Sequence, residues 1–409
     1  MNILVINHYA GSLRHGMEYR PFYLAREWVR LGHRVCIIAS SESHIRAQAP
    51  QLGGQARLDE TIDGVQYRWI ATPAYRGNGA ARVLNMLAFV AQLYRYGPRL
   101  AREFEADVVI ASSTYPLDIW PAHRIARLSS ARLLFELHDL WPLSPMELGG
   151  YPAWHPFIML LQAAENHACR HADAIVSILP KVRDHLEAHG MAPHKLHIVP
   201  NGADPAEWLG ANEQLPGLAG ARLAALRRQG KFIVGYAGTH GLSNALDTLL
   251  GAASLVSDAR IAFVLVGAGP EKARLEALCA ERKLGNVHFF DPLPKQQVPA
   301  LLACFDVAYI GWQRQRLYRF GIAPNKLIDY MMAGRAILHS VEAGNDPVAE
   351  AGCGLTVPPQ NPALVARALL ALFMLGADGR AALGQRGRSY AMANLSYPML
   401  GRRFLQACA

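Results

Sequence analysis

The chain has 409 residues, of which 51% are hydrophobic and 18% charged, and its formal net charge is +9. This length predicts two domains, and the composition is that of a globular protein rather than a disordered or fibrous one. The six cysteines include no CxxC pair, which argues against a disulfide framework and favours a reducing compartment.

The distribution of charge and of apolar residues narrows the possible partners. No apolar run approaches the ~20 residues that span a bilayer, so we expect a cytoplasmic protein. No nucleic-acid-binding motif or Lys/Arg-rich run is present. The stretch from Gly64 to Arg102 contains six arginines, no acidic residue and the apolar segment 83–94. This pattern fits a helix lying on an anionic membrane surface, or a buried helix whose flanking arginines are merely solvated.

In the first half, short apolar segments alternate with amphipathic segments, which predicts an α/β fold with a parallel, doubly wound sheet. Strands are expected at residues 2–7, 34–39, 65–70, 108–112, 132–136, 174–178 and 196–199. Helices are expected at residues 20–31, 84–104, 121–128, 157–171 and 180–189. Residues 205–230, rich in Ala, Gly, Leu and Arg, are expected to connect the domains.

The second half repeats the alternation. Strands are expected at residues 232–237, 261–266, 287–290, 307–310, 336–340 and 354–357. Helices are expected at residues 246–257, 271–283, 299–304, 326–333, 346–351 and 363–375. We therefore expect two Rossmann-like domains, 1–204 and 205–384, with ligands bound beyond the carboxyl ends of the strands in the cleft they form. The helical segment 385–409 is expected to pack back on the first domain.

The segment from Gly321 to Arg335 gives the clearest indication of function. Pro324 and Asn325 favour a turn, and the apolar spacing that follows predicts a helix. A helix N-terminus attracts phosphate, and Lys326 adds a full positive charge there. Asp329, one turn further on, can accept hydrogen bonds from sugar hydroxyls. A sugar nucleotide fits this arrangement, and an ordinary surface helix is the alternative.

Four motifs in the expected order resemble the retaining glycosyltransferases of the GT-B fold, family 4. They are the helix and strand at residues 24–35, the Pro-Asn-Gly-Ala-Asp turn at 200–204, the Gly-Ala-Gly-Pro-Glu turn at 267–271 and the helix at 325–334. The likeness covers nearly the whole chain. Residues 138–142, 236–248 and 324–327 are similar to a subgroup that makes bacterial surface polysaccharides, including N-acetylfucosamine transferases.

This resemblance implies an enzyme that moves an N-acetylated hexose or deoxyhexose from a UDP-sugar to a lipid-linked saccharide, peripheral on the inner face of the cytoplasmic membrane. It implies catalytic roles for His138 and Asp139, which follow the expected strand 132–136. The implied donor site comprises Gly16, Gly238, Thr239, His240, Gly241, Leu293, Arg316, Pro324, Asn325, Lys326, Leu327 and Asp329. The candidates on the acceptor side are Arg14, His15, Glu18 and Arg20.

The chain departs from the family pattern at the donor site. Of the usual two glutamates separated by seven residues, the second is Asp329 and the first is Gly321. Thr239 and Asn244 stand near the positions of the usual Arg and Lys. The missing glutamate removes a contact to the hexose hydroxyls, which fits a donor that lacks a usual hydroxyl.

Other functions remain open on the sequence. A UDP-sugar 2-epimerase has the same two-domain fold, and the missing residues would also fit a non-catalytic homologue. An NAD dehydrogenase is disfavoured because no GxGxxG motif follows the first expected strand. We expect no metal-ligating group among the histidines and therefore neither a metal nor another cofactor.

Overall fold

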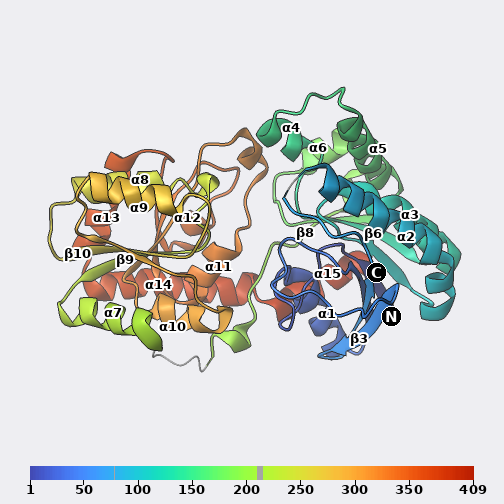
Figure 1. Ribbon diagram of the computed structural model, residues 1–409, viewed down its shortest axis with the longest axis horizontal. Coiled ribbons are helices and arrows are strands. Elements are labelled where there is room, and N and C mark those ends of the chain that lie inside the picture. The colour runs from blue at the N-terminus through green and yellow to red at the C-terminus, as the bar shows by residue number, and fades with distance from the viewer. Residues whose placement is uncertain (78, 210–214) are drawn as a thin grey trace. The chain divides into compact units, whose positions relative to one another are not determined.

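The computed structural model describes residues 1–77, 79–209 and 215–409, and its contacts divide the chain into two compact units. The N-terminal unit comprises Met1–Pro200 and Tyr397–Ala409, and the C-terminal unit comprises Asn201–Ser396. The divisions expected from the sequence lay at residues 204 and 385. Each unit is an α/β domain built on a largely parallel sheet, which confirms the predicted fold class (Figure 1).

The N-terminal unit has an eight-stranded sheet in the order β3-β4-β2-β1-β5-β6-β7-β8. Its strands are β1 (Asn2–Ile6), β2 (Arg34–Ser40), β3 (Arg57–Ile62), β4 (Val65–Ile70), β5 (Val108–Ala111), β6 (Arg132–Leu137), β7 (Ala174–Ser177) and β8 (Leu196–Ile198). All neighbours pair in parallel except β3, which runs antiparallel to β4 at the edge. The sequence did not predict β3, because this edge strand is mostly polar and lacks a buried face.

Helices cover both faces of this sheet. They are α1 (Arg20–Arg30), α2 (Ala80–Phe104), α3 (Ile119–Ser129), α4 (Leu143–Gly149), α5 (Pro156–His171), α6 (Arg183–Ala188) and α15 (Tyr397–Cys408). On one face, α15 packs against α1, where Phe404 meets Trp28 edge-on and the Trp28 indole donates to the Gly401 carbonyl. The last helix of the chain thus completes the core of the first unit.

The C-terminal unit has a six-stranded, wholly parallel sheet in the order β11-β10-β9-β12-β13-β14. Its strands are β9 (Phe232–Ala237), β10 (Ile261–Val266), β11 (Val287–Phe290), β12 (Val307–Gly311), β13 (Ala336–Ser340) and β14 (Gly354–Val357). All six match the predicted strands to within one residue. Most of these strands are continuous apolar runs buried on both faces, and such runs can be recognised in the sequence.

The helices of this unit also form two layers. They are α7 (Gly217–Arg228), α8 (Leu246–Leu255), α9 (Lys272–Glu281), α10 (Val298–Ala303), α11 (Asn325–Met332), α12 (Pro347–Ala351), α13 (Pro362–Met374) and α14 (Gly376–Asn394). One core lies between the sheet and α8 with α13, and the other between the sheet and α7, α10, α11 and α14. The segment 205–230, expected to be a connection, instead contributes α7 to the second core.

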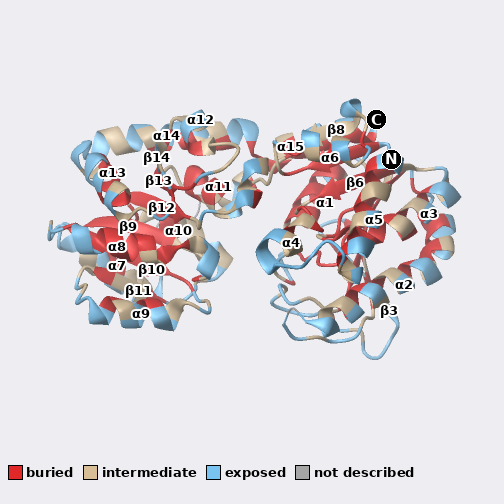
Figure 2. Cartoon of the chain, turned by 90° about the horizontal axis from the view of Figure 1, so that it is seen from above, coloured by how far each residue is buried: buried red, intermediate tan, exposed pale blue. Residues whose placement is uncertain are grey.

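Burial follows these layers, since the strands are buried and the helices expose their outer faces (Figure 2). No single helix in the described ranges is long and apolar enough to span a bilayer. Only the pair α13 and α14 meets the requirement of length and composition, and the two helices are bent by 108° at their break.

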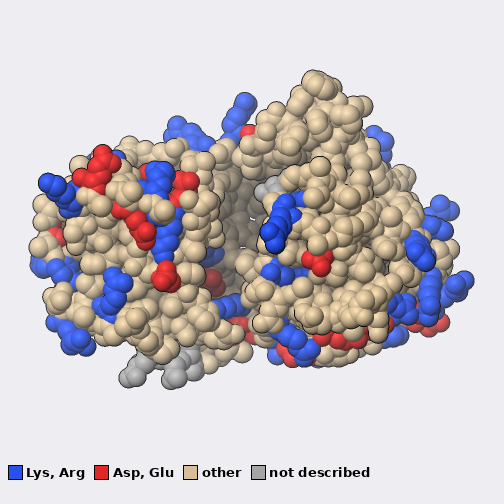
Figure 3. Space-filling view, viewed as in Figure 1, with Lys and Arg blue, Asp and Glu red and all other residues tan. Residues whose placement is uncertain are grey.

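The apolar helix expected at residues 84–104 is α2, and it is half-buried. Met86, Phe89 and Leu93 face α3 and the core, whereas Leu84 is 60% exposed and Leu87 42% exposed. Lys and Arg side chains gather on the edge of the unit that carries α2 and α3 (Figure 3). This edge combines exposed apolar residues with positive charge.

Candidate functional site

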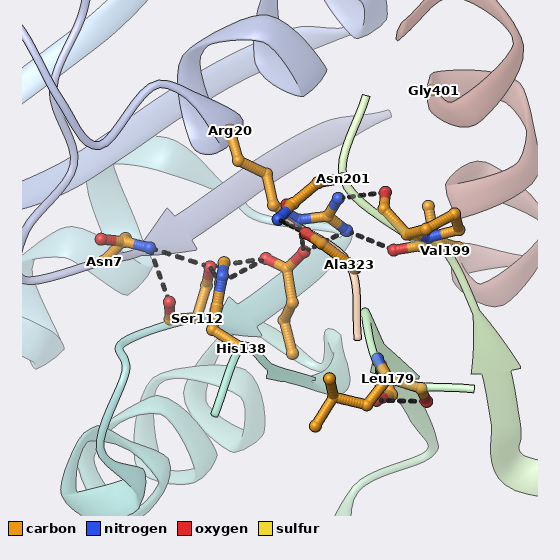
Figure 4. Close-up of polar contacts among 12 residues, drawn as sticks. Asn7, Arg20, Ser112, His138, Leu179, Val199, Asn201, Ala323 and Gly401 are labelled. Atoms are coloured by element: carbon orange, nitrogen blue, oxygen red, sulfur yellow. Dashed lines mark hydrogen bonds and ion pairs between the residues drawn. The ribbon is translucent and has the colours of Figure 1, made fainter. Parts of the chain in front are cut away.

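Polar side chains meet at the carboxyl ends of three neighbouring strands in the N-terminal unit. Asn7 follows β1, Ser112 follows β5, and Glu136 and His138 lie at the end of β6 and just beyond it. The His138 Nε2 atom lies 3.0 Å from the Ser112 Oγ and 3.3 Å from the Glu136 Oε2 (Figure 4). Adjacent parallel strands end at the same edge of a sheet, so this edge is where a ligand is expected.

Arg20 closes the network from α1. It is 1% exposed, and its Nε donates to the Glu136 Oε1 over 2.9 Å. Its other guanidinium nitrogens donate to the carbonyls of Val199 and Pro200, the last residues before the chain leaves this unit. The sequence suggested that Arg20 contacts an acceptor. The structure instead buries it as a positioning residue behind His138.

The charge of the Glu136 carboxylate is compensated by its neighbours. Burial opposes ionisation of Glu136, but the neighbouring His138 and Arg20 lower the pKa of Glu136 to about 2. The Glu136 carboxylate also accepts from the Ser112 hydroxyl over 2.6 Å. Glu136 therefore stays ionised at neutral pH and orients the imidazole of His138.

Asp139, the second catalytic candidate, has both carboxylate oxygens engaged. One oxygen accepts from the Leu140 amide and the Ser144 hydroxyl, and the other from the Trp141 indole. Burial raises the pKa of Asp139. These hydrogen bonds show that Asp139 fixes the conformation of the loop after His138.

The loop between β1 and α1 is tightly folded. A side chain at Gly11 would place its Cβ 1.9 Å from the Gly16 carbonyl, and Gly16 itself has a φ of +92°. His15 is buried, whereas the exposed Arg14 pairs with Glu60 over 2.8 Å. Of the acceptor-side candidates, Arg14 and the half-exposed Glu18 are accessible to a ligand.

In the C-terminal unit, Lys326 lies in the first turn of α11 with its amine turned inward. The amine donates to the Tyr236 hydroxyl over 2.8 Å and to the Asn244 Oδ1 over 2.9 Å. Gly238 packs beside it with a φ of +151°, a conformation that favours glycine, and an added Cβ would lie 2.7 Å from the Lys326 Cε. Asn244, which stands near a usual basic position, therefore holds the remaining lysine in place.

The loop after β9, Gly238–Gly241, packs on the loop after β10. A Cβ at Gly267 would lie 2.0 Å from the Gly238 carbonyl oxygen, and one at Gly269 would lie 2.4 Å from the His240 carbonyl oxygen. The Gly-Ala-Gly turn thus allows the two loops to touch. His240 is fully buried between them, and among the described residues neither ring nitrogen has a hydrogen-bond partner.

The titratable groups here have strongly shifted pKa values. Burial lowers the pKa of Lys326 to about 7, although Asp329 opposes the shift. Burial raises the pKa of Asp329 to about 7, against the pull of Lys295. Burial and the nearby Lys272 lower the pKa of His240 to about 4. The site therefore holds a neutral imidazole and an amine that is half-charged near neutrality.

Two asparagines that the sequence did not single out fix the backbone before α11. The Asn345 side chain bonds both the amide and the carbonyl of Ile322, and the Asn201 amide donates to the Ala323 carbonyl over 2.8 Å. Gly321 has a φ of +96°, a conformation that favours glycine. The position of the family's first glutamate thus has neither a side chain nor a backbone suited to one.

The remaining donor candidates surround this core. Thr239 accepts from the Tyr236 hydroxyl and from the Asn244 amide through its carbonyl. Leu293 is half-buried, and Asn325 and Arg316 are exposed. Pro324 immediately precedes α11, and the side chain of Leu327 is buried in the core. Gly16 belongs to the N-terminal unit.

Comparison with solved structures defines the class of protein. The fold matches sucrose-phosphate synthase from Thermosynechococcus elongatus at a TM-score of 0.72 and 16% identity, covering 99% of this chain and 98% of that one. It matches HepE from Anabaena, solved with UDP-glucose, at a TM-score of 0.65 and 12% identity, covering 99% and 98%. The chain has the GT-B glycosyltransferase fold.

Two family models assign the chain more closely. Residues 15–202 match a glycosyl transferase 4-like domain, and residues 231–374 match the glycosyl transferases group 1 domain. The chain belongs to the group 1 glycosyltransferases, family GT4, and is an enzyme of that class.

Two curated relatives align with a part of the chain. The putative colanic acid biosynthesis glycosyl transferase WcaI of Escherichia coli K12 is 27% identical over 226 residues, 54% of this chain. The probable glycosyltransferase WbjE of Pseudomonas aeruginosa is 23% identical over 313 residues, 74% of this chain. The match spans 53% of the length of WcaI and 77% of the length of WbjE.

Replacing Arg20 by Met should destabilise the N-terminal unit by about 3–5 kcal/mol, because it leaves the buried Glu136 charge without its partner. Urea unfolding followed by intrinsic fluorescence measures the change. Arg127→Met is the control, since Arg127 is exposed on α3 of the same unit and its replacement should cost less than about 1 kcal/mol. Equal effects of the two substitutions would contradict the role given to Arg20.

Proposed function

We propose that this glycosyltransferase moves an N-acetylated hexose or deoxyhexose, such as N-acetylfucosamine, from a UDP-sugar to a lipid-linked saccharide. The product would enter O-antigen, capsule or lipopolysaccharide synthesis, and the anomeric configuration would be retained. The observation that carries the proposal is the inward-facing amine of Lys326 at the start of α11, beside the glycine loop after β9.

The donor pyrophosphate fits this part of the C-terminal unit. The negative charge that develops on the departing pyrophosphate would be stabilised by the Lys326 amine. The free amides at the start of α11 and the backbone of Gly238–Gly241 would add to this stabilisation. A preorganised donor aimed at developing charge contributes ~3–4 kcal/mol to transition-state stabilisation. His240 supports the assignment, because a buried imidazole without a partner is a group that a bound ligand can satisfy.

In the proposed reaction, the bond between the anomeric carbon and the pyrophosphate oxygen breaks as the acceptor hydroxyl attacks. The leaving phosphate takes the acceptor's proton on the same face of the sugar. His138, oriented by Ser112 and Glu136, would contact the transferred sugar and stabilise its developing positive charge. Its ring is 12% exposed, so one edge remains available to a ligand.

The sugar and the nucleotide are inferred from three sources. HepE was solved with UDP-glucose, which supports a UDP-linked donor. WcaI is named for colanic acid biosynthesis, which supports a surface polysaccharide as the product. Gly321 in place of a glutamate supports a donor that lacks one of the usual hydroxyls.

A lipid-linked acceptor fits a protein that docks on an anionic membrane surface. Leu84, Leu87 and Tyr94 on α2 are exposed, and so is Leu128 on α3. Arginines of the same two helices are exposed as well, although Arg99 is paired with Glu103. Apolar side chains among cations are typical of peripheral membrane surfaces.

UDP should stabilise the wild-type protein in a thermal-shift titration more than GDP, ADP or dTDP. At 100 times its dissociation constant, a ligand adds about 2.7 kcal/mol of stability. Lys326→Met should remove most of this response because it deletes the proposed phosphate cation. Lys231→Met is the control, since Lys231 directly precedes β9 at the opposite edge of the sheet. No response to any nucleotide would favour a non-catalytic homologue.

The same titration has an expected pH dependence. Lys326 must be protonated to hold a diphosphate, and burial sets its pKa at about 7 in the free protein. A bound anion raises that pKa, so UDP affinity should fall as the pH rises above about 7. Calorimetry should detect proton uptake on binding at alkaline pH, and Lys326→Met should abolish it. A flat profile between pH 6.5 and 8.5 would argue against contact with Lys326.

His138→Asn should bind UDP normally but lower the release of UDP from the sugar donor by at least about 100-fold, the scale of losing one electrostatic contact. A coupled assay for UDP, run with UDP-N-acetylhexosamines and with lipid-linked saccharides, measures the rate. His194→Asn, at an exposed site in the same unit, should keep full activity. Full activity in His138→Asn would remove His138 from the reaction.

Replacing Leu84 and Leu87 together by Glu should reduce co-sedimentation of the protein with phosphatidylglycerol-containing vesicles. The substitutions remove exposed apolar contacts and reverse the local charge. Leu218→Glu, an 84% exposed leucine on α7, is the control and should bind vesicles like the wild type. If none of the three proteins binds vesicles, α2 is not a membrane-docking helix.

A further inference from the structure

Two histidines and a buried glutamate meet between α5 and α6, away from the sites described above. His185 lies on α6, His189 follows its last turn, and Glu165 lies on α5. Each of the three offers one ligand atom, and these atoms all lie within 4.8 Å of one another. The expectation of no metal-ligating group among the histidines did not take these three residues into account. The overlooked signal was the HxxxH spacing, which places two imidazoles on one face of a helical turn.

The carboxylate of Glu165 faces both imidazoles. The His185 Nε2 lies 2.8 Å from one carboxylate oxygen, and the His189 Nε2 lies 3.9 Å from the other. The two rings lie with their centroids 4.4 Å apart. Gln162 donates to the same carboxylate over 2.8 Å and helps to fix its orientation.

The hydrogen bond on the far side of His189 sets the orientation of its ring. The Nδ1 atom lies 2.7 Å from the backbone carbonyl of His185, to which it can only donate. In the neutral ring, Nε2 then carries a lone pair, and this lone pair is directed toward a carboxylate oxygen 3.9 Å away. Metal-ligating histidines usually donate their other ring nitrogen in this way. A cation between the two acceptors would satisfy both.

Burial adds a second reason to expect a cation. The Glu165 side chain is fully buried, and a buried carboxylate is costly unless its charge is compensated. His185 supplies one partner. A metal ion would compensate the charge more completely, taking the place of the proton that His185 donates.

We propose that Glu165, His185 and His189 bind a divalent transition-metal ion of the Zn²⁺ class. Two imidazoles and one carboxylate suit such ions rather than Mg²⁺ or Ca²⁺, which prefer oxygen ligands. Bonds of about 2.0–2.1 Å place the ligand atoms of a tetrahedral site ~3.3 Å apart. The distances from the Glu165 oxygens to the two imidazole nitrogens, 2.8 and 3.9 Å, lie on either side of this value. Small side-chain rotations would therefore complete the site. His189 is 24% exposed, which leaves room for water as a fourth ligand.

The ion would act on the structure of the N-terminal unit and not on the transfer reaction. It would join α6 and the turn that follows it to α5, which packs against α3. Nothing in this role depends on the donor or acceptor proposed above.

A second group of histidines is a weaker candidate but a necessary control. His123 on α3 and His167 on α5 already bond each other over 2.9 Å, and His171 is exposed beside them. This group includes no carboxylate ligand. It can nevertheless take up zinc loosely at the surface, so the test must separate the two groups.

The test uses the untagged, full-length protein, stripped of metal with a chelator and titrated with Zn²⁺ against a fluorescent zinc indicator. We expect one tight equivalent and a rise in the unfolding temperature. His189→Gln keeps the pair between His185 and Glu165 but should weaken binding by more than about 10-fold, the lower end of the loss caused by removing even an indirect partner. The double variant His123→Gln/His171→Gln should bind the tight equivalent unchanged.

Other outcomes would overturn the proposal. Tight binding that survives in His189→Gln, or disappears in the double variant, would assign the metal to the surface histidines. No tight binding by the wild type would leave Glu165 and His185 as a buried ion pair. A second measurement does not depend on how His189→Gln folds: Co²⁺ is added to the wild-type protein. A visible absorption band displaced by one equivalent of Zn²⁺ supports the site, and its absence contradicts it.

Discussion

The buried pair of Arg20 and Glu136 is the interaction on which the N-terminal site depends. A charge removed from water is tolerated only when another charge and a full set of hydrogen bonds surround it. Here that requirement ties together the start of α1, the end of β6 and the carbonyls of Val199 and Pro200. His138 takes its orientation from the same carboxylate, so the geometry of this edge of the sheet follows from the pairing.

The buried cation of the C-terminal unit, Lys326, has hydrogen-bond partners of a different kind. Lys326 is bound by a hydroxyl and an amide oxygen, both neutral, and burial lowers its pKa. The arginine is paired with a carboxylate of the fold, whereas both hydrogen bonds of the lysine amine go to neutral groups. Under the function proposed above, the first cation serves the structure and the second serves the ligand.

The buried strands could be predicted from the sequence because their apolar pattern is local. The edge strand β3 could not, since its polar residues carry no such pattern. The resemblance pointed to His138 and Lys326, but it did not reveal what holds them. Ser112, Glu136 and Asn244 act through contacts between segments far apart in the chain. Arg20 was assigned to the acceptor because a sequence does not show that a charged residue next to a loop turns inward.

The path of the chain has a consequence for how the protein is made. The C-terminal unit is one continuous segment that precedes α15, so it is complete in the chain before α15 is made. The N-terminal unit, although synthesised first, lacks Leu400 and Phe404 of its core until α15 has been made. Until then the apolar surface of α1 is uncovered. Exposed apolar surface promotes aggregation, so the nascent chain most needs protection during this interval.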